Sequence, residues 1–184
     1  MKIVVCIKQV PDTTEVKLDP VKNTLIRDGV PSIINPDDKA GIELALQIKE
    51  SVPGSTLTVV SMGPPQAEVA LREALAMGCD DGILISDRAF GGADTWATSS
   101  TIAGALRKLD YDIIIAGRQA IDGDTAQVGP QIAEHLQIPQ ISYCEELRVE
   151  DGKFIVKRQF EDRYHIIEIK PPCLITTLSE EITP

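Results

Sequence analysis

The sequence has few of the side chains on which most metal and catalytic sites depend. It holds only two histidines, His135 and His165, and neither lies in a pattern typical of a metal site or a catalytic triad. Four cysteines are scattered without a CxxC pair, so we expect buried, reduced thiols. A Walker loop and a G-x-G-x-x-G fingerprint are both absent. Nothing in the sequence assembles a hydrolase, a transferase or a metal centre.

Long apolar runs and an excess of basic charge are also missing. No apolar run approaches the ~20 residues that span a bilayer. The apolar stretch in residues 1–8 is too short for a signal peptide and has no cleavage site. The net charge is −10, whereas nucleic-acid-binding proteins need a clustered basic surface. We therefore expect a cytoplasmic protein that neither inserts into a membrane nor binds nucleic acid.

What the sequence does contain is a strand-helix alternation. Its 184 residues, 43% hydrophobic and 25% charged, are typical of one large globular domain. The patterns predict strands at Lys2–Lys8, Thr56–Ser61, Gly82–Ser86 and Asp112–Ala116. Between them they predict helices from Asn35 to about Glu50, at Gln66–Met77, at Thr95–Leu109 and one ending near Leu136. Short connections imply βαβ crossovers, so residues 1–139 should form a doubly wound, mostly parallel, Rossmann-like α/β body.

Two β segments lie outside that alternation. A short peripheral hairpin is expected from Val16–Asp19 and Thr24–Arg27. Residues 140–184 predict an antiparallel β extension of the same domain, with strands at Ile141–Glu150, Lys153–Phe160, Tyr164–Ile169 and Cys173–Thr177.

Ligands of open α/β sheets bind beyond the carboxyl ends of the strands. Small residues recur at these ends and let a flat ring or a phosphate approach the backbone: Cys6, Ser61, Gly63, Gly117 and Ala120. The loop before the first helix adds Asn35 and Asp37, and Asn35 is expected to cap that helix. We therefore expect a nucleotide site at this edge of the sheet.

The segment Gly117–Gly129 is the most informative part of that edge. It leaves a strand and enters a helix near Thr125, where backbone N–H groups and the helix dipole suit a phosphate. Asp122 and Asp124 would repel a phosphate, so we expect one to accept from ribose hydroxyls or to cap the helix. The alternative is a plain turn followed by an N-cap.

A second polar helix start lies at Gly91–Ser100. Asp94 is expected to cap this helix, and hydroxyl residues fill its first turns. The alternative is capping alone, with Trp96 as a packing anchor. These serines and threonines have no partner base and are not candidate nucleophiles.

Several ordered segments resemble the beta subunits of electron transfer flavoproteins. They are Lys2–Asp12, Ile34–Asp38, Val60–Pro64, Ala74–Asp80, Gly117–Thr125, Val156–Arg158 and Lys170–Leu174. The resemblance covers essentially the whole chain. It implies a heterodimer with an alpha subunit that carries electrons and is not an enzyme alone.

Two kinds of beta subunit exist in that family. In simple carriers the beta subunit holds AMP and the working FAD lies mainly on the alpha subunit. In electron-bifurcating members the same pocket holds a second FAD, which takes a hydride from NADH. One electron then goes to ferredoxin or flavodoxin, and the other passes through the alpha FAD to an acyl-CoA dehydrogenase-type partner.

The sequence resembles the bifurcating kind at Ala93–Thr98 and Asp122–Pro130. Carried over by position, the resemblance implies that the nucleotide is lined by Cys6, Asn35, Asp37, Ser61, Met62, Gly63, Gly117, Arg118, Gln119, Ala120, Ile121, Asp122, Gly123, Asp124, Thr125, Gln127, Val128 and Gly129. The flavin ring or its diphosphate should be approached by Asp94, Thr95 and Thr98.

Family members usually continue beyond the position of Pro184 into a long arm that wraps the alpha subunit. The sequence lacks this arm, which puts docking to that subunit in doubt. Two alternatives to bifurcation stay open: a simple carrier subunit with structural AMP, and a stand-alone nucleotide-binding regulatory protein.

Overall fold

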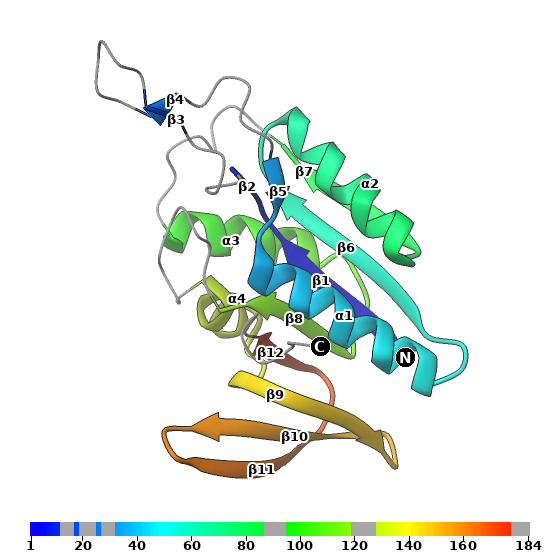
Figure 1. Cartoon of the computed structure of the whole chain (residues 1–184). Coiled ribbons are helices and arrows are strands. Elements are labelled where there is room, and N and C mark those ends of the chain that lie inside the picture. Colours follow the sequence, from blue (N-terminus) through cyan, green and yellow to red (C-terminus); the bar gives the residue numbers. More distant parts are fainter. Residues whose placement is uncertain (12–16, 19–24, 27–31, 87–94, 119–127, 178–184) are drawn as a thin grey trace.

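The computed structural model describes residues 1–11, 17–18, 25–26, 32–86, 95–118 and 128–177. Its centre is an eight-stranded sheet in the order β11-β10-β9-β12-β8-β1-β6-β7 (Figure 1). The strands are β1 (Lys2–Ile7), β6 (Thr56–Met62), β7 (Asp81–Ile85), β8 (Ile113–Gly117), β9 (Gln140–Glu150), β10 (Lys153–Phe160), β11 (Arg163–Ile169) and β12 (Cys173–Thr177). The mixed α/β class predicted from the alternating patterns is confirmed.

The sheet changes from parallel to antiparallel at β9. Strands β7, β6, β1, β8, β12 and β9 pair in parallel, and β9, β10 and β11 pair antiparallel. Although β12 comes last among the described strands, it lies between β8 and β9 and pairs in parallel with both. The prediction that Cys173–Thr177 belongs to an antiparallel extension is therefore wrong for this strand. Its burial on both faces explains its uninterrupted apolar and hydroxyl sequence, Cys-Leu-Ile-Thr-Thr.

Helices cover both faces of the parallel part. The helices are α1 (Pro36–Ser51), α2 (Glu68–Met77, after a single 3-10 turn at Pro65–Ala67), α3 (Thr95–Leu106) and α4 (Val128–Leu136). Apolar residues of α1 and α2 join one core with Val5 and Ile7, whereas those of α3 and α4 join the other core with Val4 and Cys6. This alternation along β1 follows the two-residue period of a strand.

The helix ends follow local chemistry. Pro36 opens α1, where its missing N–H costs nothing, and Gly78 ends α2 with a φ of 123°. We expected α3 to reach Leu109, but it ends at Leu106. Lys108 and Leu109 donate to carbonyls three residues back, so the chain tightens there into a turn.

Two small antiparallel pairs complete the described structure. Strand β2 (Gln9–Pro11) pairs with β5 (Ser32–Ile34), and β3 (Lys17–Leu18) pairs with β4 (Leu25–Ile26), which confirms the predicted hairpin. No helix within the described ranges is both long and apolar enough to cross a membrane.

Candidate functional site

The strand order places a topological switch point, which we call the crevice, between the carboxyl ends of β1 and β8. From β1 the chain passes through α1 to β6 on one side, whereas from β8 it passes through α4 to the strands on the other side. The two connections also cover opposite faces of the sheet. Such a point of divergence is where ligands bind in open α/β sheets. We call this end of the sheet, where β1, β6, β8 and β12 end, the carboxyl edge.

The segment Asn35–Asp38 ties three of these strand ends together. The backbone N–H of Asn35 donates to the carbonyl of Lys8, directly after β1, over 2.8 Å. Thr177 at the end of β12 donates from Oγ1 to the carbonyl of Asp37 over 3.0 Å. The start of α1 is therefore fixed against β1 and β12 by hydrogen bonds between residues far apart in the sequence.

Asp38 makes the third connection. Its Oδ2 accepts from the N–H of Lys8 over 2.8 Å, and its Oδ1 accepts from the N–H of Gly117 over 3.0 Å. Burial raises the pKa of this carboxyl to about 7, although hydrogen bonds from Lys8, Asn35 and Gly117 lower it. The charge of Asp37 raises the pKa further. Asp38 thus bridges the ends of β1 and β8 at the crevice itself.

The expected capping role of Asn35 is wrong in its detail. Asn35 occupies the N-cap position, but its side chain makes no capping hydrogen bond to the helix backbone. It bonds instead to the carboxylate of Asp38. The Asn35 side chain is therefore engaged by a charged acceptor, and it does not cap the first N–H groups of α1.

Two of the predicted glycines have a packing reason for being small. A Cβ on Gly117 would clash with the carboxylate of Asp38 and lie 2.9 Å from the Cβ of Asp37. A Cβ on Gly129 would lie 2.9 Å from the Cγ2 of Thr176. Gly117 lets α1 approach β8, and Gly129 lets α4 approach β12.

Cys6 is unsuited to redox chemistry in this fold. It is buried against the α3 and α4 side, and burial, followed by the charge of Asp38, raises its thiol pKa to about 12. A thiol with so high a pKa stays protonated and is a poor nucleophile. Cys6 therefore offers a small apolar surface beneath the crevice.

Two polar atoms at the carboxyl edge are buried without a hydrogen-bond partner among the described residues. They are the Oγ of Ser61, near the end of β6, and the Nε of Arg118, directly after β8. The backbone N–H of Arg118 is held by the carbonyl of Thr177 over 2.9 Å. Buried polar groups are almost always paired in native structures. A guanidinium donor at this point therefore fits an anionic ligand such as a nucleotide phosphate.

Met62 ends β6 at the same edge and Gly63 follows it directly. Both residues are partly exposed. The N–H of Gly63 donates to the carbonyl of Ile85 over 3.0 Å, which holds β6 to β7 there. Val128 and Gly129 open α4, so both lie at the helix end that faces the edge.

The start of α3 faces the same edge, because the helix runs back from the carboxyl end of β7. Thr95 begins α3 and Thr98 lies in its first turn, half-buried. Ser99 Oγ lies 2.9 Å from the carbonyl of Trp96 and 3.0 Å from Oε1 of Gln131 on α4. Trp96 is 51% exposed, and its ring lies 4.2 Å from the ring of His135 on α4 at a tilt of 46°, so it packs between the helices without being buried.

The remaining predicted site residues lie outside the described residues: Asp94, Gln119, Ala120, Ile121, Asp122, Gly123, Asp124, Thr125 and Gln127. Asp38 was missed by sequence reasoning. The two acids after Pro36 indicated a helix start, and nothing in the sequence distinguished the one that reaches across to β1 and β8. Within the described ranges, no three His, Cys, Asp or Glu side chains gather as a metal site.

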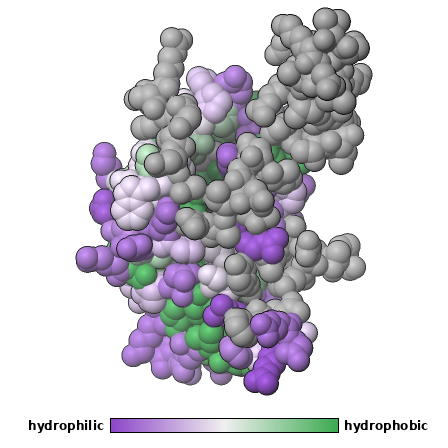
Figure 2. All heavy atoms as spheres, turned by 90° about the vertical axis from the view of Figure 1, so that its left-hand side faces the viewer, coloured by the Kyte–Doolittle hydropathy of each residue, from purple (hydrophilic) through white to green (hydrophobic). Residues whose placement is uncertain are grey.

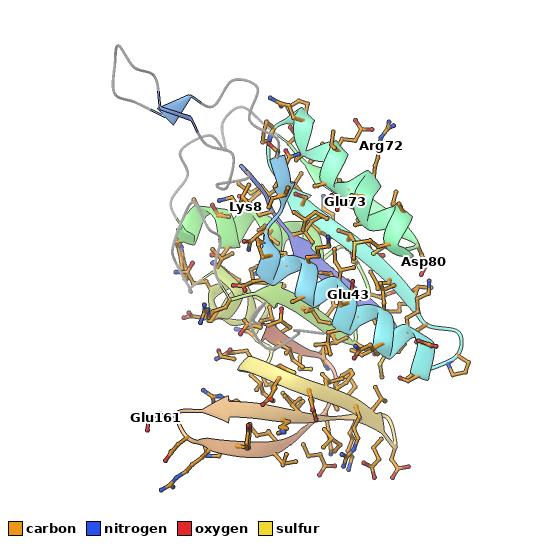
Figure 3. The ribbon with its side chains drawn as sticks, viewed as in Figure 1. Lys8, Glu43, Arg72, Glu73, Asp80 and Glu161 are labelled. Atoms are coloured by element: carbon orange, nitrogen blue, oxygen red, sulfur yellow. The ribbon has the colours of Figure 1, made fainter. Side chains whose placement is uncertain are left out.

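Figure 2 looks onto the carboxyl edge, because β1 and β6 point toward the left of Figure 1. Hydrophilic and intermediate residues dominate its described surface, with an apolar area lower down at the height of the antiparallel strands. Figure 3 shows Lys8 at this edge and Asp80 toward the opposite one. The edge is therefore a polar surface with small buried residues beneath it.

Comparisons with known proteins agree with this arrangement. A family profile described as "Electron transfer flavoprotein domain" matches residues 22–184. The "Electron transfer flavoprotein subunit beta" of Clostridium acetobutylicum is 61% identical over 184 residues, which is 100% of this chain and 71% of that protein. The "Caffeyl-CoA reductase-Etf complex subunit CarD" of Acetobacterium woodii is 59% identical over 98% of this chain and 69% of its own.

A third relative is the "Acryloyl-CoA reductase electron transfer subunit gamma" of Anaerotignum propionicum, 52% identical over 98% of this chain and 68% of its own length. The family profile covers most of the chain, and the identities extend across all of the strands that form the carboxyl edge. The chain belongs to the electron transfer flavoprotein family, as a beta subunit.

Proposed function

We propose that the chain binds FAD at the carboxyl edge and serves as the beta subunit of an electron-bifurcating flavoprotein. One observation carries the nucleotide part of the proposal: the buried Nε of Arg118 has no partner among the described residues at the point where β1 and β8 diverge. A charged donor buried without a partner is costly. A phosphate of the bound nucleotide would supply the missing acceptor.

The residues of the edge divide into binding and shaping groups. Arg118 donates to phosphate, and the N-terminal ends of α3 and α4 present further backbone donors toward the same edge. Cys6 gives a flat ring or ribose close access to the sheet, while Ser61 offers a hydroxyl that has no partner among the described residues. A bound flavin would accept a hydride from NADH and pass its electrons on singly, which is chemistry that the side chains alone do not supply.

The resemblance of residues 93–98 and 122–130 to bifurcating proteins supports FAD over AMP. The names of two relatives support an acyl-CoA partner, because they place those proteins with a caffeyl-CoA reductase and an acryloyl-CoA reductase. We accordingly propose three partners for this chain: an alpha subunit, an acyl-CoA dehydrogenase-type enzyme, and ferredoxin or flavodoxin as the low-potential acceptor.

Nucleotide content tests the proposal directly. The native complex would be purified with its alpha subunit and denatured with acid, and the released nucleotides would be identified by chromatography. Two FAD and no AMP per heterodimer are expected, followed by bleaching of the flavin absorbance on titration with NADH. One FAD with one AMP would overturn bifurcation and leave a simple carrier.

A pair of variants tests the role of Arg118. Arg118→Gln removes the charge and should weaken nucleotide binding by about tenfold or more, since charge-assisted hydrogen bonds are the strong ones. Arg118→Lys keeps a positive charge without the planar fork and should retain part of the affinity. Equal affinities in the native protein and both variants would remove Arg118 from the site.

A further inference from the structure

We propose that Asp38 is a positioning residue of the nucleotide site, whose carboxylate holds the ends of β1 and β8 in register and keeps phosphate away from their backbone N–H groups. The proposal rests on the proposed nucleotide binding and names the residue that gives the crevice its shape. Asp38 would act on the ligand indirectly, through its hydrogen bonds to the backbone of Lys8 and Gly117.

The two hydrogen bonds of Asp38 lie where the pairing between β1 and β8 ends. Oδ2 accepts from Lys8 N over 2.8 Å, and Oδ1 accepts from Gly117 N over 3.0 Å. These N–H groups follow the last β1 and β8 residues that pair with each other, Cys6 and Ala116. The ladder between β1 and β8 thus stops there, and the carboxylate takes over the role of joining the two chains.

The Asp38 carboxylate is packed closely against Gly117 at the end of β8. Gly117 has no side chain, and any Cβ there would clash with the carboxylate. Asp38 is only 6% exposed, so its carboxylate lies behind the surface of the crevice. The position of the carboxylate is therefore set by packing, and the strand ends are set by the carboxylate.

The charge of the Asp38 carboxylate affects where a phosphate can lie. Backbone N–H groups at strand ends commonly bind phosphate in nucleotide sites. Here both of these donors already serve a carboxylate, and its negative charge would repel a phosphate placed beside it. The ligand should therefore present an uncharged part, ribose or base, to Asp38. Its phosphates should lie toward Arg118 and the helix ends.

The opposite edge of the sheet offers a matched control. Asp80 accepts from the backbone N–H of Leu57 over 2.8 Å, near the amino end of β6, and pairs with Lys49 over 2.7 Å. Figure 3 shows Asp80 far from Lys8, across the length of the sheet. Asp80→Asn removes a carboxylate that holds a strand end without touching the crevice.

The experiment compares the native complex, stripped of nucleotide, with its Asp38→Asn and Asp80→Asn variants. Asparagine keeps the size of the side chain but turns one acceptor into a donor that faces an N–H group. Binding of adenosine and of AMP is measured by calorimetry at pH 8 and pH 6. Adenosine carries no phosphate, so any pH dependence of its affinity belongs to the protein.

At pH 8 we expect Asp38→Asn to bind adenosine about ten- to a hundredfold more weakly, from the loss of a charge-assisted hydrogen bond. The ratio of AMP to adenosine affinity should rise in the variant, because the repelling charge is gone. Asp80→Asn should match the native protein in its adenosine affinity and in the ratio of AMP to adenosine affinity. If Asp38 had a purely structural role, the variant would bind adenosine and AMP more weakly by the same factor, and the ratio of the two affinities would not change.

The pH dependence provides a second readout. The native affinity for adenosine should fall from pH 8 to pH 6 as Asp38 is protonated, and the Asp38→Asn affinity should stay constant. The ionisable groups coupled to Asp38 are Asp37 and Cys6, and Lys8 and Arg118 flank the strand ends. These groups are present in the native protein and in Asp38→Asn, so the difference between the two pH dependences of adenosine affinity reports Asp38 alone.

Hydrogen exchange tests the connection without any ligand. The amides of Lys8 and Gly117 should exchange faster in Asp38→Asn, whereas Asp80→Asn should instead expose the amide of Leu57. Unchanged protection of Lys8 and Gly117 together with native adenosine affinity in Asp38→Asn would overturn the proposal. If the native complex binds neither adenosine nor AMP, the proposed nucleotide site fails, whereas the exchange of the Lys8 and Gly117 amides still tests the connection through Asp38. The two failures are therefore distinguishable.

Discussion

Thr177 donates a hydrogen bond from its Oγ1 to the carbonyl of Asp37 over 3.0 Å, joining residues 140 positions apart. The bond links the last described residue of β12 to the first turn of α1, and both residues are buried. It also brings the end of β12 to the crevice between β1 and β8.

The change Thr177→Val should lower the free energy of unfolding by about 0.5–1.5 kcal/mol, because it removes a buried hydrogen bond while keeping the side-chain volume. Urea denaturation followed by circular dichroism measures the effect. Thr177→Ser retains the hydroxyl and should lose less. A smaller loss in Thr177→Val than in Thr177→Ser would show that packing of the methyl group, which only the serine variant lacks, matters more than the hydrogen bond.

The change Gly117→Ala should destabilise the protein and weaken nucleotide binding together. An added Cβ would clash with the Asp38 carboxylate, so either α1 or the end of β8 must shift. Overpacking of this kind costs typically about 1–3 kcal/mol. Thermal unfolding and calorimetric titration with AMP measure the two effects.

Gly104 in α3 provides the matched control, since a Cβ there meets nothing within 4 Å. Gly104→Ala should stabilise the protein by about 0.5–1 kcal/mol through its better helix propensity, with unchanged nucleotide affinity. A Gly117→Ala protein as stable as Gly104→Ala would contradict the close approach of α1 to β8.

The thiols of Cys6, Cys79 and Cys173 should resist alkylation in the native protein at pH 8. Burial raises their pKa values to about 12, 11 and 12, so the reactive thiolate is scarce at this pH. Mass spectrometry after treatment with iodoacetamide should find these three residues unmodified, and modified after denaturation in guanidinium. Rapid alkylation of native Cys6 would show that the crevice opens to reagents.

The fold was largely predictable because its signals are local. The β-branched run of β1, the Pro36 and Gly78 helix boundaries, and the hairpins of β9 to β11 each come from neighbouring residues, and their bounds were predicted to within a few positions. The placement of β12 between β8 and β9 depends on which strands pair across the sheet, which no local pattern encodes.

The site was predictable only in part, because some of its residues are brought together by contacts between distant parts of the sequence. Its position at the carboxyl edge follows from the alternation of strands and helices. The role of Asp38 depends on contacts across 30 positions to Lys8 and 79 positions to Gly117, so it emerged only from the structure. Gly117 was predicted to admit a ligand, whereas its observed neighbours are Asp37 and Asp38.

The buried Asp38 should make the stability of the protein depend on pH in an unusual direction. Its pKa is raised from 3.8 to about 7 in the folded protein, chiefly by burial. Between these values the folded state keeps a proton that the unfolded state releases, so the stabilising contribution is complete below about pH 4 and is lost as pH rises through about 7. Since a tenfold change in proton affinity corresponds to about 1.4 kcal/mol, the whole contribution is on the order of 4 kcal/mol.

Stability measured by urea denaturation at pH 5, 6, 7 and 8 checks this prediction when the native protein is compared with Asp38→Asn. Other ionisable groups contribute equally to both proteins, so the difference in their unfolding free energies reports Asp38. The difference should shift in favour of the variant as pH rises from 5 to 7 and should level off above it. A constant difference would show that Asp38 is already ionised at pH 5. The hydrogen bonds from Lys8, Asn35 and Gly117 would then outweigh burial, and the charge that shapes the crevice would cost the fold little.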